Sequence, residues 1–287
     1  MKPDYHVASF SGGKDSTAML LRMIELGYHI DEVVFCDTTM EFPGMIRHVE
    51  KVKKVVEAAG IKFVTLRSKK DFEYYLSEVD VPNRRKDSNH YGVPGYGWPS
   101  HKVRWCTRHL KLDLIKTHFT ELRQQYNVIQ YIGIAADEDY RMERKNNQDP
   151  NHRHPLRDWC WTEADAMSYC REKGYDWEGL YEIFNRVSCW CCPLQAYSEL
   201  RKLRRLFPDL WQKLLELDAK QWQTFAHGYS VADFDKRFAL EDALEAAGHS
   251  IKNRQFFADL KRHLAGEITV EEILQEREND QIKIAEL

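Results

Sequence analysis

The sequence predicts an α/β protein with a doubly wound, mostly parallel sheet and a helical C-terminal region. In the first half of the 287 residues, short apolar runs alternate with segments of helical spacing. A loop of glycines and hydroxyl residues joins the first apolar run to the first helical segment. After residue 159 the short apolar runs stop and only helical spacing continues. Such alternation is typical of βαβ units with helices on both faces of a parallel sheet.

The apolar residues place the individual elements. Met19, Leu20, Met23 and Leu26 form one stripe at helical spacing, and Gly27 follows where that helix should end. By the same reasoning we expect strands at 5–10, 32–38, 62–66 and 128–134, and helices at 14–26, 44–59 and 107–123.

The chain is expected to divide into an α/β nucleotide-binding domain (1–160) and a helical C-terminal region (161–287) that carries the Cys-x-Cys-Cys motif. Thr162 and Asp165 have the spacing of a helix capping box. Residues 81–102 are rich in Pro, Gly and Asn and show no periodicity, so we expect a mobile loop that covers the ligand.

The composition is that of an ordinary globular protein, with 43% hydrophobic and 30% charged residues. The chain contains no apolar run of 18 residues and no apolar signal segment near residue 1, so we expect a cytoplasmic protein without a membrane partner. The net charge of −3 does not indicate a general nucleic-acid binder. Basic residues nevertheless gather at 84–86, 101–111, 141–145, 152–154 and 201–205. They are either separate solvated charges or one face for an anionic partner larger than ATP.

The stretch SGGKDS, residues 11–16, lies where a strand should become a helix. Its glycines allow a tight turn and a close approach of backbone N–H groups to an anion, and Lys14 adds a full positive charge. The spacing fits neither the Walker A pattern nor G-x-G-x-x-G. The alternative is a glycine turn with an ordinary helix cap.

Several motifs in order resemble one family. SFSGGKDST (9–17) is similar to the pyrophosphate loop of the PP-loop ATPases, the adenine-nucleotide α-hydrolase superfamily. Further stretches resemble the branch of phosphoadenosine-phosphosulfate (PAPS) reductases. They are CDTTMEFPGM (36–45), RWCTRHLK (104–111), YIGIAADEDYRMER (131–144) and PLRDWCWTEAD (155–165).

The resemblance implies ATP and Mg²⁺ as ligands and an α–β cleavage that releases pyrophosphate. Lys14, Asp15 and Ser16 would be catalytic, and Gly133 would let the fourth strand approach the nucleotide. Ala135 stands where the family usually has arginine, which weakens the expectation of a sulfonucleotide substrate. The full set implied for nucleotide binding is Ser9, Ser11, Gly12, Gly13, Lys14, Asp15, Ser16, Asp37, Gly133, Arg141 and Arg144.

The cysteines predict a second centre. Cys189 and Cys192 offer two soft ligands on one turn, and Cys106 offers a distant third. The resemblance to cluster-bearing adenylylsulfate reductases implies a [4Fe-4S] cluster, with Trp105 in place of one of their cysteines. Cys191 is a candidate fourth ligand. A zinc ion, closed by His109 or Cys191, and free thiols are the alternatives.

We therefore expect an ATP pyrophosphatase that activates an acceptor by adenylation for sulfur transfer. Its acceptor would be a nucleic acid, and a protein such as a cysteine desulfurase would donate sulfur. The first alternative is PAPS or adenylylsulfate reduction, although no cysteine follows Cys192 to act as that family's nucleophile. The second is a non-catalytic nucleotide- or nucleic-acid-binding module.

Overall fold

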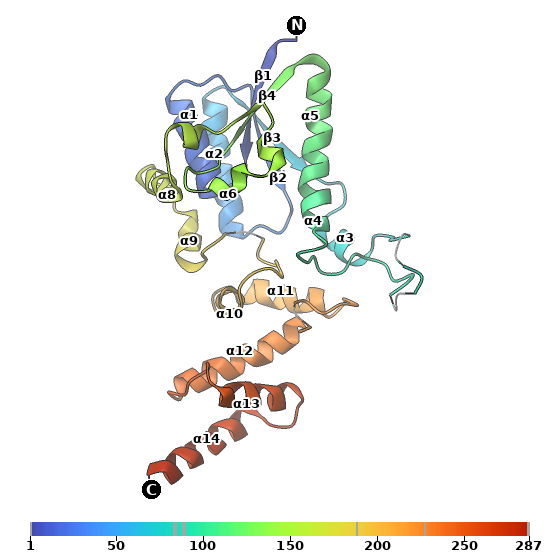
Figure 1. The fold of residues 1–287 in the computed structure, drawn as a ribbon, viewed down its shortest axis with the longest axis vertical. Helices are drawn as coiled ribbons and strands as arrows, with labels where there is room; N and C mark the ends of the chain where they lie inside the picture. The colour runs from blue at the N-terminus through green and yellow to red at the C-terminus, as the bar shows by residue number, and fades with distance from the viewer. Residues whose placement is uncertain (1, 83–84, 88–89, 188, 227, 286–287) are drawn as a thin grey trace. The chain divides into compact units, whose positions relative to one another are not determined.

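The core of the fold is a parallel sheet. The computed structural model describes residues 2–82, 85–87, 90–187, 189–226 and 228–285. Within these residues the sheet has five strands, paired in parallel in the order β3-β2-β1-β4-β5 (Figure 1). The four predicted strands and the fold class are confirmed, whereas the two-residue β5 was not predicted. The strands are β1 (Asp4–Phe10), β2 (Glu32–Asp37), β3 (Lys62–Arg67), β4 (Asn127–Ile132) and β5 (His152–Arg153).

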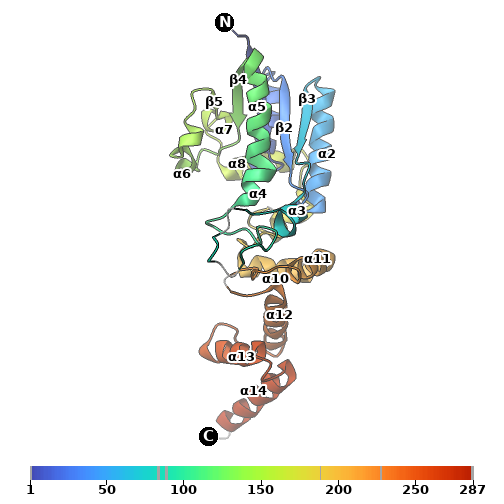
Figure 2. The same cartoon turned by 90° about the vertical axis from the view of Figure 1, so that its right-hand side faces the viewer.

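Helices cover both faces of this sheet. On one face α5 (Asp113–Gln125) buries Phe119 against Val7, Val34 and Val128 (Figure 2). Because side chains alternate along a strand, Phe10 points to the opposite face. There its ring lies 6.4 Å from that of His48 in α2 (Pro43–Ala58). The helix α1 (Lys14–Glu25) leads from β1 towards β2 and packs against α8 (Glu163–Glu172).

The strand order fixes where a ligand can bind. From β1 the chain proceeds outward to β2 and β3, then returns to place β4 on the other side of β1. The order therefore reverses between β1 and β4. In open parallel sheets the carboxyl ends of the strands at such a reversal form the binding crevice.

The predicted helix at 107–123 is part of a longer helical run. It begins with α4 (Trp105–Thr107), passes through a π-helical turn η1 (Arg108–Leu112) and continues as α5. The short helix α3 (Phe72–Ser77) was not predicted. The remaining short elements are α6 (Asp139–Met142), η2 (Lys145–Asn147), α7 (Pro155–Asp158), η3 (Trp177–Gly179) and α9 (Leu180–Ile183).

Part of the predicted loop 81–102 is bound to α3 and its C-terminal end. The N–H groups of Gly95, Tyr96 and Gly97 donate to the carbonyl groups of Val79, Tyr75 and Leu76. Gly95 has a φ of +76°, and a Cβ there would lie 2.3 Å from the Leu76 oxygen. Only glycine suits this position. Residues 83–84 and 88–89 of the predicted loop, including Arg84 of the basic run, lie outside the described residues.

The contacts divide the chain into two compact units, which do not follow the expected division at residue 160. The N-terminal unit contains residues 1–83 and 94–192, and the C-terminal unit contains residues 84–93 and 193–287. Residues 161–192 belong with the sheet because α8 packs on α1, and because the Trp177 indole donates a hydrogen bond to the Gly12 carbonyl at 2.7 Å.

The expected capping box is confirmed, since Thr162 and Asp165 exchange side-chain and backbone hydrogen bonds.

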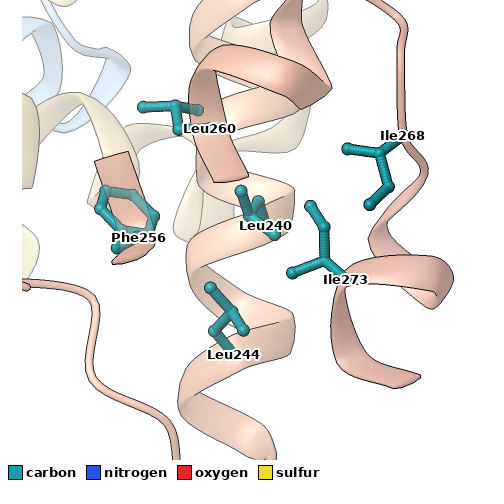
Figure 3. Packing of buried hydrophobic residues seen from close by; sticks show 6 residues of the cluster. All are labelled: Leu240, Leu244, Phe256, Leu260, Ile268 and Ile273. Carbon is teal, nitrogen blue, oxygen red and sulfur yellow. The ribbon is translucent and has the colours of Figure 1, made fainter. Parts of the chain in front are cut away.

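The C-terminal unit has its own helical core. Leu240, Leu244, Phe256, Leu260 and Ile273 pack together, as Figure 3 shows. A buried ion pair joins two helices beside this core, with the Arg277 guanidinium 2.7 Å from the Asp259 carboxylate. The helices are α10 (Tyr197–Leu206), α11 (Pro208–Asp218), α12 (Val231–Ala246), α13 (Arg254–Leu264) and α14 (Val270–Ala285). None of the helices in the described ranges is long and apolar enough to cross a membrane.

Candidate nucleotide site and cysteine cluster

The loop after β1 is folded around the hydroxyl groups at the start of α1. The Ser16 hydroxyl accepts a hydrogen bond from the Ser11 N–H at 3.1 Å and donates to the Gly13 carbonyl at 3.0 Å. Thr17 also donates to the Gly13 carbonyl, at 3.0 Å. These bonds hold the loop at the positive end of α1, where an anion is favoured.

Two aromatic residues from beyond residue 160 fix the other side of the loop. Gly12 has a φ of +81° and a Cβ there would lie 2.7 Å from the Met45 sulfur, so a larger residue does not fit. Trp177 holds the Gly12 carbonyl. The hydroxyl of Tyr181 accepts a hydrogen bond from the Lys14 N–H at 3.1 Å, and the Trp177 and Tyr181 rings meet edge to face at 4.9 Å.

Three carboxylates gather beside Lys14. Asp15, Glu138 and Glu163 each offer an oxygen, and these oxygens all lie within 4.8 Å of one another. The Lys14 ammonium lies 3.1 Å from Asp15 and 2.7 Å from Glu163. Arg141 lies 2.7 Å from Glu138. The predicted residues Lys14, Asp15 and Arg141 are thus brought together, with two acids that the sequence reasoning did not select.

This crowding of charges shifts the pKa values of Lys14 and Asp15. Burial lowers the pKa of Lys14, but the hydrogen bond that its ammonium donates to Glu163 and the charge of Asp15 outweigh burial and raise the pKa overall. Burial raises the pKa of Asp15, and the charges of Glu163 and Glu138 raise it further against the opposing effect of Lys14. A cation among these oxygens therefore stabilises the ionised carboxylates.

Gly133 brings the end of β4 against the first turn of α1. A Cβ on Gly133 would lie 2.9 Å from the Ser16 nitrogen and 3.0 Å from the Asp15 carbonyl oxygen. This glycine therefore contacts the loop backbone, which places Asp15 near Glu138. Ala135 is fully buried, and its N–H lies 3.2 Å from the Glu138 carboxylate.

The other predicted nucleotide residues lie farther along the sheet edge or within the sheet. At the carboxyl end of β2, the Asp37 carboxylate accepts a hydrogen bond from the Thr39 N–H at 2.7 Å. The Ser9 hydroxyl accepts from the Gln130 amide at 2.7 Å, so its side chain bonds within the sheet. Arg144 is exposed, and its guanidinium lies 5.8 Å from the centre of the Tyr140 ring.

The structure brings the cysteines of distant segments together. Cys191 is buried, and its pKa is raised by burial and then by the charges of Cys189, Cys192 and Cys106. The Cys192 N–H donates to the Cys189 carbonyl at 3.2 Å, which closes a tight turn. The Cys189 sulfur lies 3.5 Å from the Thr38 hydroxyl. The cysteine cluster (106, 189, 191 and 192) therefore lies near the segment that follows β2, beside the strand that carries the phosphate loop.

The spacing of the sulfur atoms bears on which metal they suit. Four thiolates around one zinc ion at about 2.3 Å would lie about 3.8 Å apart. Among the described residues, no cysteine belongs to a group of three or more candidate ligand atoms within 4.8 Å of one another. His109 stacks on Tyr75 at 4.9 Å, and its Nδ1 lies 3.0 Å from Asp113. Thiolates are also the donors of iron–sulfur clusters, in which each thiolate binds a different iron.

Sequence reasoning missed several residues of the site. Glu138 and Glu163 lie inside two of the motifs quoted above, and Glu163 is the first residue of a helix that a capping box announces. The sequence could therefore have indicated Glu163, because its place at the start of a helix is predictable from the capping box. Tertiary packing alone brings three further residues to the loop after β1, namely His48, Trp177 and Tyr181. No local pattern in the sequence predicts these contacts.

Comparison with known proteins identifies the family. Residues 5–195 match the phosphoadenosine phosphosulfate reductase domain. The chain belongs to the PAPS reductase family. This match covers the phosphate loop, the carboxylate group and the cysteine cluster, and it confirms the relationship to the PP-loop superfamily.

Comparisons with individual proteins say less about this chain than the family match does. Two uncharacterized proteins of Methanocaldococcus jannaschii are 30% identical over 214 residues and 28% identical over 217 residues. These matches cover 72% and 73% of this chain but 40% and 46% of the relatives, so the chain spans less than half of their length. A solved structure, the U34-tRNA thiolase NcsA of Methanococcus maripaludis with its [4Fe-4S] cluster, matches at 15% identity and a TM-score of 0.36. That match covers 88% of this chain and 77% of the thiolase. A likeness this weak carries no argument about this chain.

His48 makes the support of the loop sensitive to acid. Its Nε2 lies 3.0 Å from the Thr17 hydroxyl, and its ring stacks on Trp177 at 4.5 Å. Burial, and then the charge of Lys51, lowers its pKa from 6.5 to about 4. The folded state therefore binds fewer protons than the unfolded state between these pH values. Neutral, buried His48 therefore contributes to the free energy of unfolding above pH 6.5. We expect this contribution, about 3 kcal/mol in all, to be lost as the pH falls towards 4.

Urea unfolding at several pH values measures this effect. A His48→Gln variant should lack this part of the pH dependence, because the amide keeps a polar partner for Thr17 and does not titrate. His29→Gln, at an exposed histidine, is the matched control and should behave as the wild type. Identical pH profiles for His48→Gln and the wild type would show that His48 does not destabilise the protein in acid.

Proposed function

We propose that this protein is a PP-loop enzyme that cleaves ATP to AMP and pyrophosphate and adenylates an acceptor for sulfur transfer. The observation that carries the proposal is the arrangement around Lys14. A glycine loop at the start of α1 lies beside three carboxylates whose oxygens are within 4.8 Å of one another. Membership in the PAPS reductase family, whose domain matches residues 5–195, supports an adenine nucleotide as the ligand.

The carboxylates give a reason for Mg²⁺ in this site. Three carboxylates next to a polyphosphate would repel it unless a cation lay between them. Asp15, Glu138 and Glu163 are oxygen ligands of the kind that Mg²⁺ prefers, and Mg²⁺ commonly joins carboxylates to substrate phosphates. With Mg²⁺ on these oxygens, Lys14 could release Asp15 and Glu163 and pair with the phosphates instead.

The first reaction step then needs few protein groups. An oxygen of the acceptor forms a bond to the α-phosphorus, the bond to the bridging oxygen breaks, and pyrophosphate leaves with the electron pair. The loop N–H groups, Ser16 and Lys14 would stabilise the charge that develops on the departing pyrophosphate. Arg141, already beside Glu138, could neutralise a further phosphate oxygen.

We propose that the cysteine cluster serves the sulfur chemistry of the second step. Cys106, Cys189 and Cys192, with Cys191 as a candidate fourth residue, would hold a [4Fe-4S] cluster. Held by three cysteines, such a cluster would leave its fourth iron open to a sulfide ligand, whereas Cys191 as a fourth ligand would close it. In the second step hydrosulfide, formed when a thiol reductant cleaves the persulfide of a donor such as a cysteine desulfurase, would add to the adenylated centre, and AMP would leave with the acceptor's oxygen. A base or backbone group of a nucleic acid is the acceptor we propose.

The Lys14→Ala substitution tests the nucleotide site. We expect the dissociation constant for Mg·ATP to rise about 10- to 100-fold, because a charge-assisted hydrogen bond to phosphate is lost. Calorimetric titration of the full chain measures this affinity. Lys54→Ala, which removes an exposed lysine from α2, is the matched control. Separation of the products of α-labelled ATP, incubated with Mg²⁺ and total tRNA, should show AMP. ADP as the main product would contradict the proposal.

Serine substitutions test the cysteine cluster. Protein purified without oxygen should contain iron and acid-labile sulfide and absorb visible light. Replacing Cys106, Cys189 or Cys192 with serine should abolish that absorbance because a thiolate ligand is lost. Cys160→Ser and Cys170→Ser are the controls, since Cys160 is exposed and Cys170 is buried against α1, with its sulfur 3.5 Å from the Lys14 carbonyl oxygen. Loss of colour in Cys191→Ser would identify a fourth ligand. A colourless protein with stoichiometric zinc would contradict the cluster.

A further inference from the structure

The hydroxyl of Tyr181 is bound to one of the free donors at the start of α1. The first N–H groups of a helix have no partner within the helix. In α1 the Thr17 N–H is the first to bond back, to the Gly13 carbonyl at 3.0 Å. The Lys14 N–H, one of the donors before it, donates to the Tyr181 hydroxyl at 3.1 Å. An oxygen from a distant segment therefore lies where the phosphate loop would offer an N–H to an anion.

This hydroxyl still has its own proton to donate. A tyrosine hydroxyl both accepts and donates, and the bond from the Lys14 N–H uses only its acceptor side. Within the described parts of the chain, Tyr181 makes no other hydrogen bond. A hydroxyl that accepts a hydrogen bond is polarised and becomes a better donor. Tyr181 can therefore pass the donor capacity of the helix start on to a ligand.

Burial keeps Tyr181 in its protonated form. Burial raises the pKa of the hydroxyl above its usual value of 10.0, the hydrogen bond and charge of Lys14 oppose this rise, and the charges of Asp15 and Cys170 add to it. The neutral hydroxyl, unlike the carboxylates on the other side of Lys14, does not repel a polyphosphate. It can therefore bind a phosphate oxygen without a cation between them.

Gly13 leaves space in front of this hydroxyl. A Cβ on Gly13 would lie 3.4 Å from the Tyr181 hydroxyl oxygen and 3.6 Å from the Ser11 Oγ. The φ of Gly13 is −74°, which any residue can adopt, so the backbone conformation does not require glycine there. The missing side chain instead leaves open a space that two hydroxyl groups face. An oxygen of a bound phosphate would fit there.

We propose that Tyr181 is a phosphate-binding residue of the nucleotide site, with its O–H donating to an oxygen of the pyrophosphate portion of ATP. The inference rests on the proposed function and adds a ligand contact from outside the SGGKDS stretch. Because that oxygen gains charge as pyrophosphate departs, the same hydrogen bond would stabilise the leaving group. The Trp177 ring, edge to face with that of Tyr181 at 4.9 Å, supports the ring in this position.

The Tyr181→Phe substitution tests this contact, because it removes the hydroxyl and keeps the ring. We expect the dissociation constant of the full chain for Mg·ATP to rise about 10-fold or more, since a hydrogen bond to a charged phosphate is lost. Calorimetric titration measures it. Tyr5→Phe is the matched control and should bind as the wild type does. It removes a hydroxyl that donates to Glu32 at 3.3 Å, near the start of β1 and away from the loop. Affinity of Tyr181→Phe equal to or tighter than that of the wild type would overturn the proposal.

Fluorine NMR separates a contact with the ligand from a role in holding the loop. When 3-fluorotyrosine, which keeps the hydroxyl, replaces Tyr181, its fluorine resonance should shift as Mg·ATP is added. The same label in place of Tyr5 should not respond. A resonance of residue 181 that stays in place while Mg·ATP binds would also contradict a phosphate contact.

The Lys14→Ala variant keeps this inference apart from the proposed function. If the wild type binds no Mg·ATP, the proposed function fails, and the role of Tyr181 fails with it. If Lys14→Ala weakens binding and Tyr181→Phe does not, the nucleotide site stands and only the role of Tyr181 is wrong.

Discussion

The candidate site depends on the close approach of β4 to the first turn of α1. Gly133, the residue after β4, has no room for a Cβ, since one would lie 2.9 Å from the Ser16 nitrogen. Because the backbones approach this closely, Glu138, five residues beyond Gly133, reaches the same small volume as Asp15. This contact sets Glu138 beside Asp15, whereas Glu163 and its ion pair with Lys14 come from the packing of α8 on α1.

A second set of contacts holds the loop from the other side. Trp177 binds the Gly12 carbonyl, Tyr181 binds the Lys14 N–H, and His48 supports both Thr17 and Trp177. These residues explain why the segment after residue 160 belongs to the N-terminal unit. A change from mixed to purely helical spacing does not mark a domain boundary where the following helices pack against α1 and the loop after β1.

Local signals predicted the fold well. The strands β1 to β4, the helices α1 and α2 and the Thr162 capping box could be predicted because each has its own apolar period, glycine stop or cap. The two-residue β5 and the short α3 could not, because elements of this length show no period and exist through pairing with neighbours. The carboxylate group was only partly predictable. Asp15 lies in a motif, but that Glu138 and Glu163 meet it is a property of the strand order and of the α1–α8 packing.

The affinity of Gly133→Ala for Mg·ATP tests the central claim most directly. The added methyl group must push β4 away from the Asp15–Ser16 backbone. We therefore expect the dissociation constant to rise roughly tenfold or more in a protein that remains folded. Gly60→Ala is the comparison, because its φ of +75° makes alanine unfavourable although a Cβ there meets nothing within 4 Å. It should lose about 1 kcal/mol of stability and keep its ATP affinity. If Gly133→Ala binds Mg·ATP as tightly as Gly60→Ala, the contact between β4 and α1 does not organise a nucleotide site.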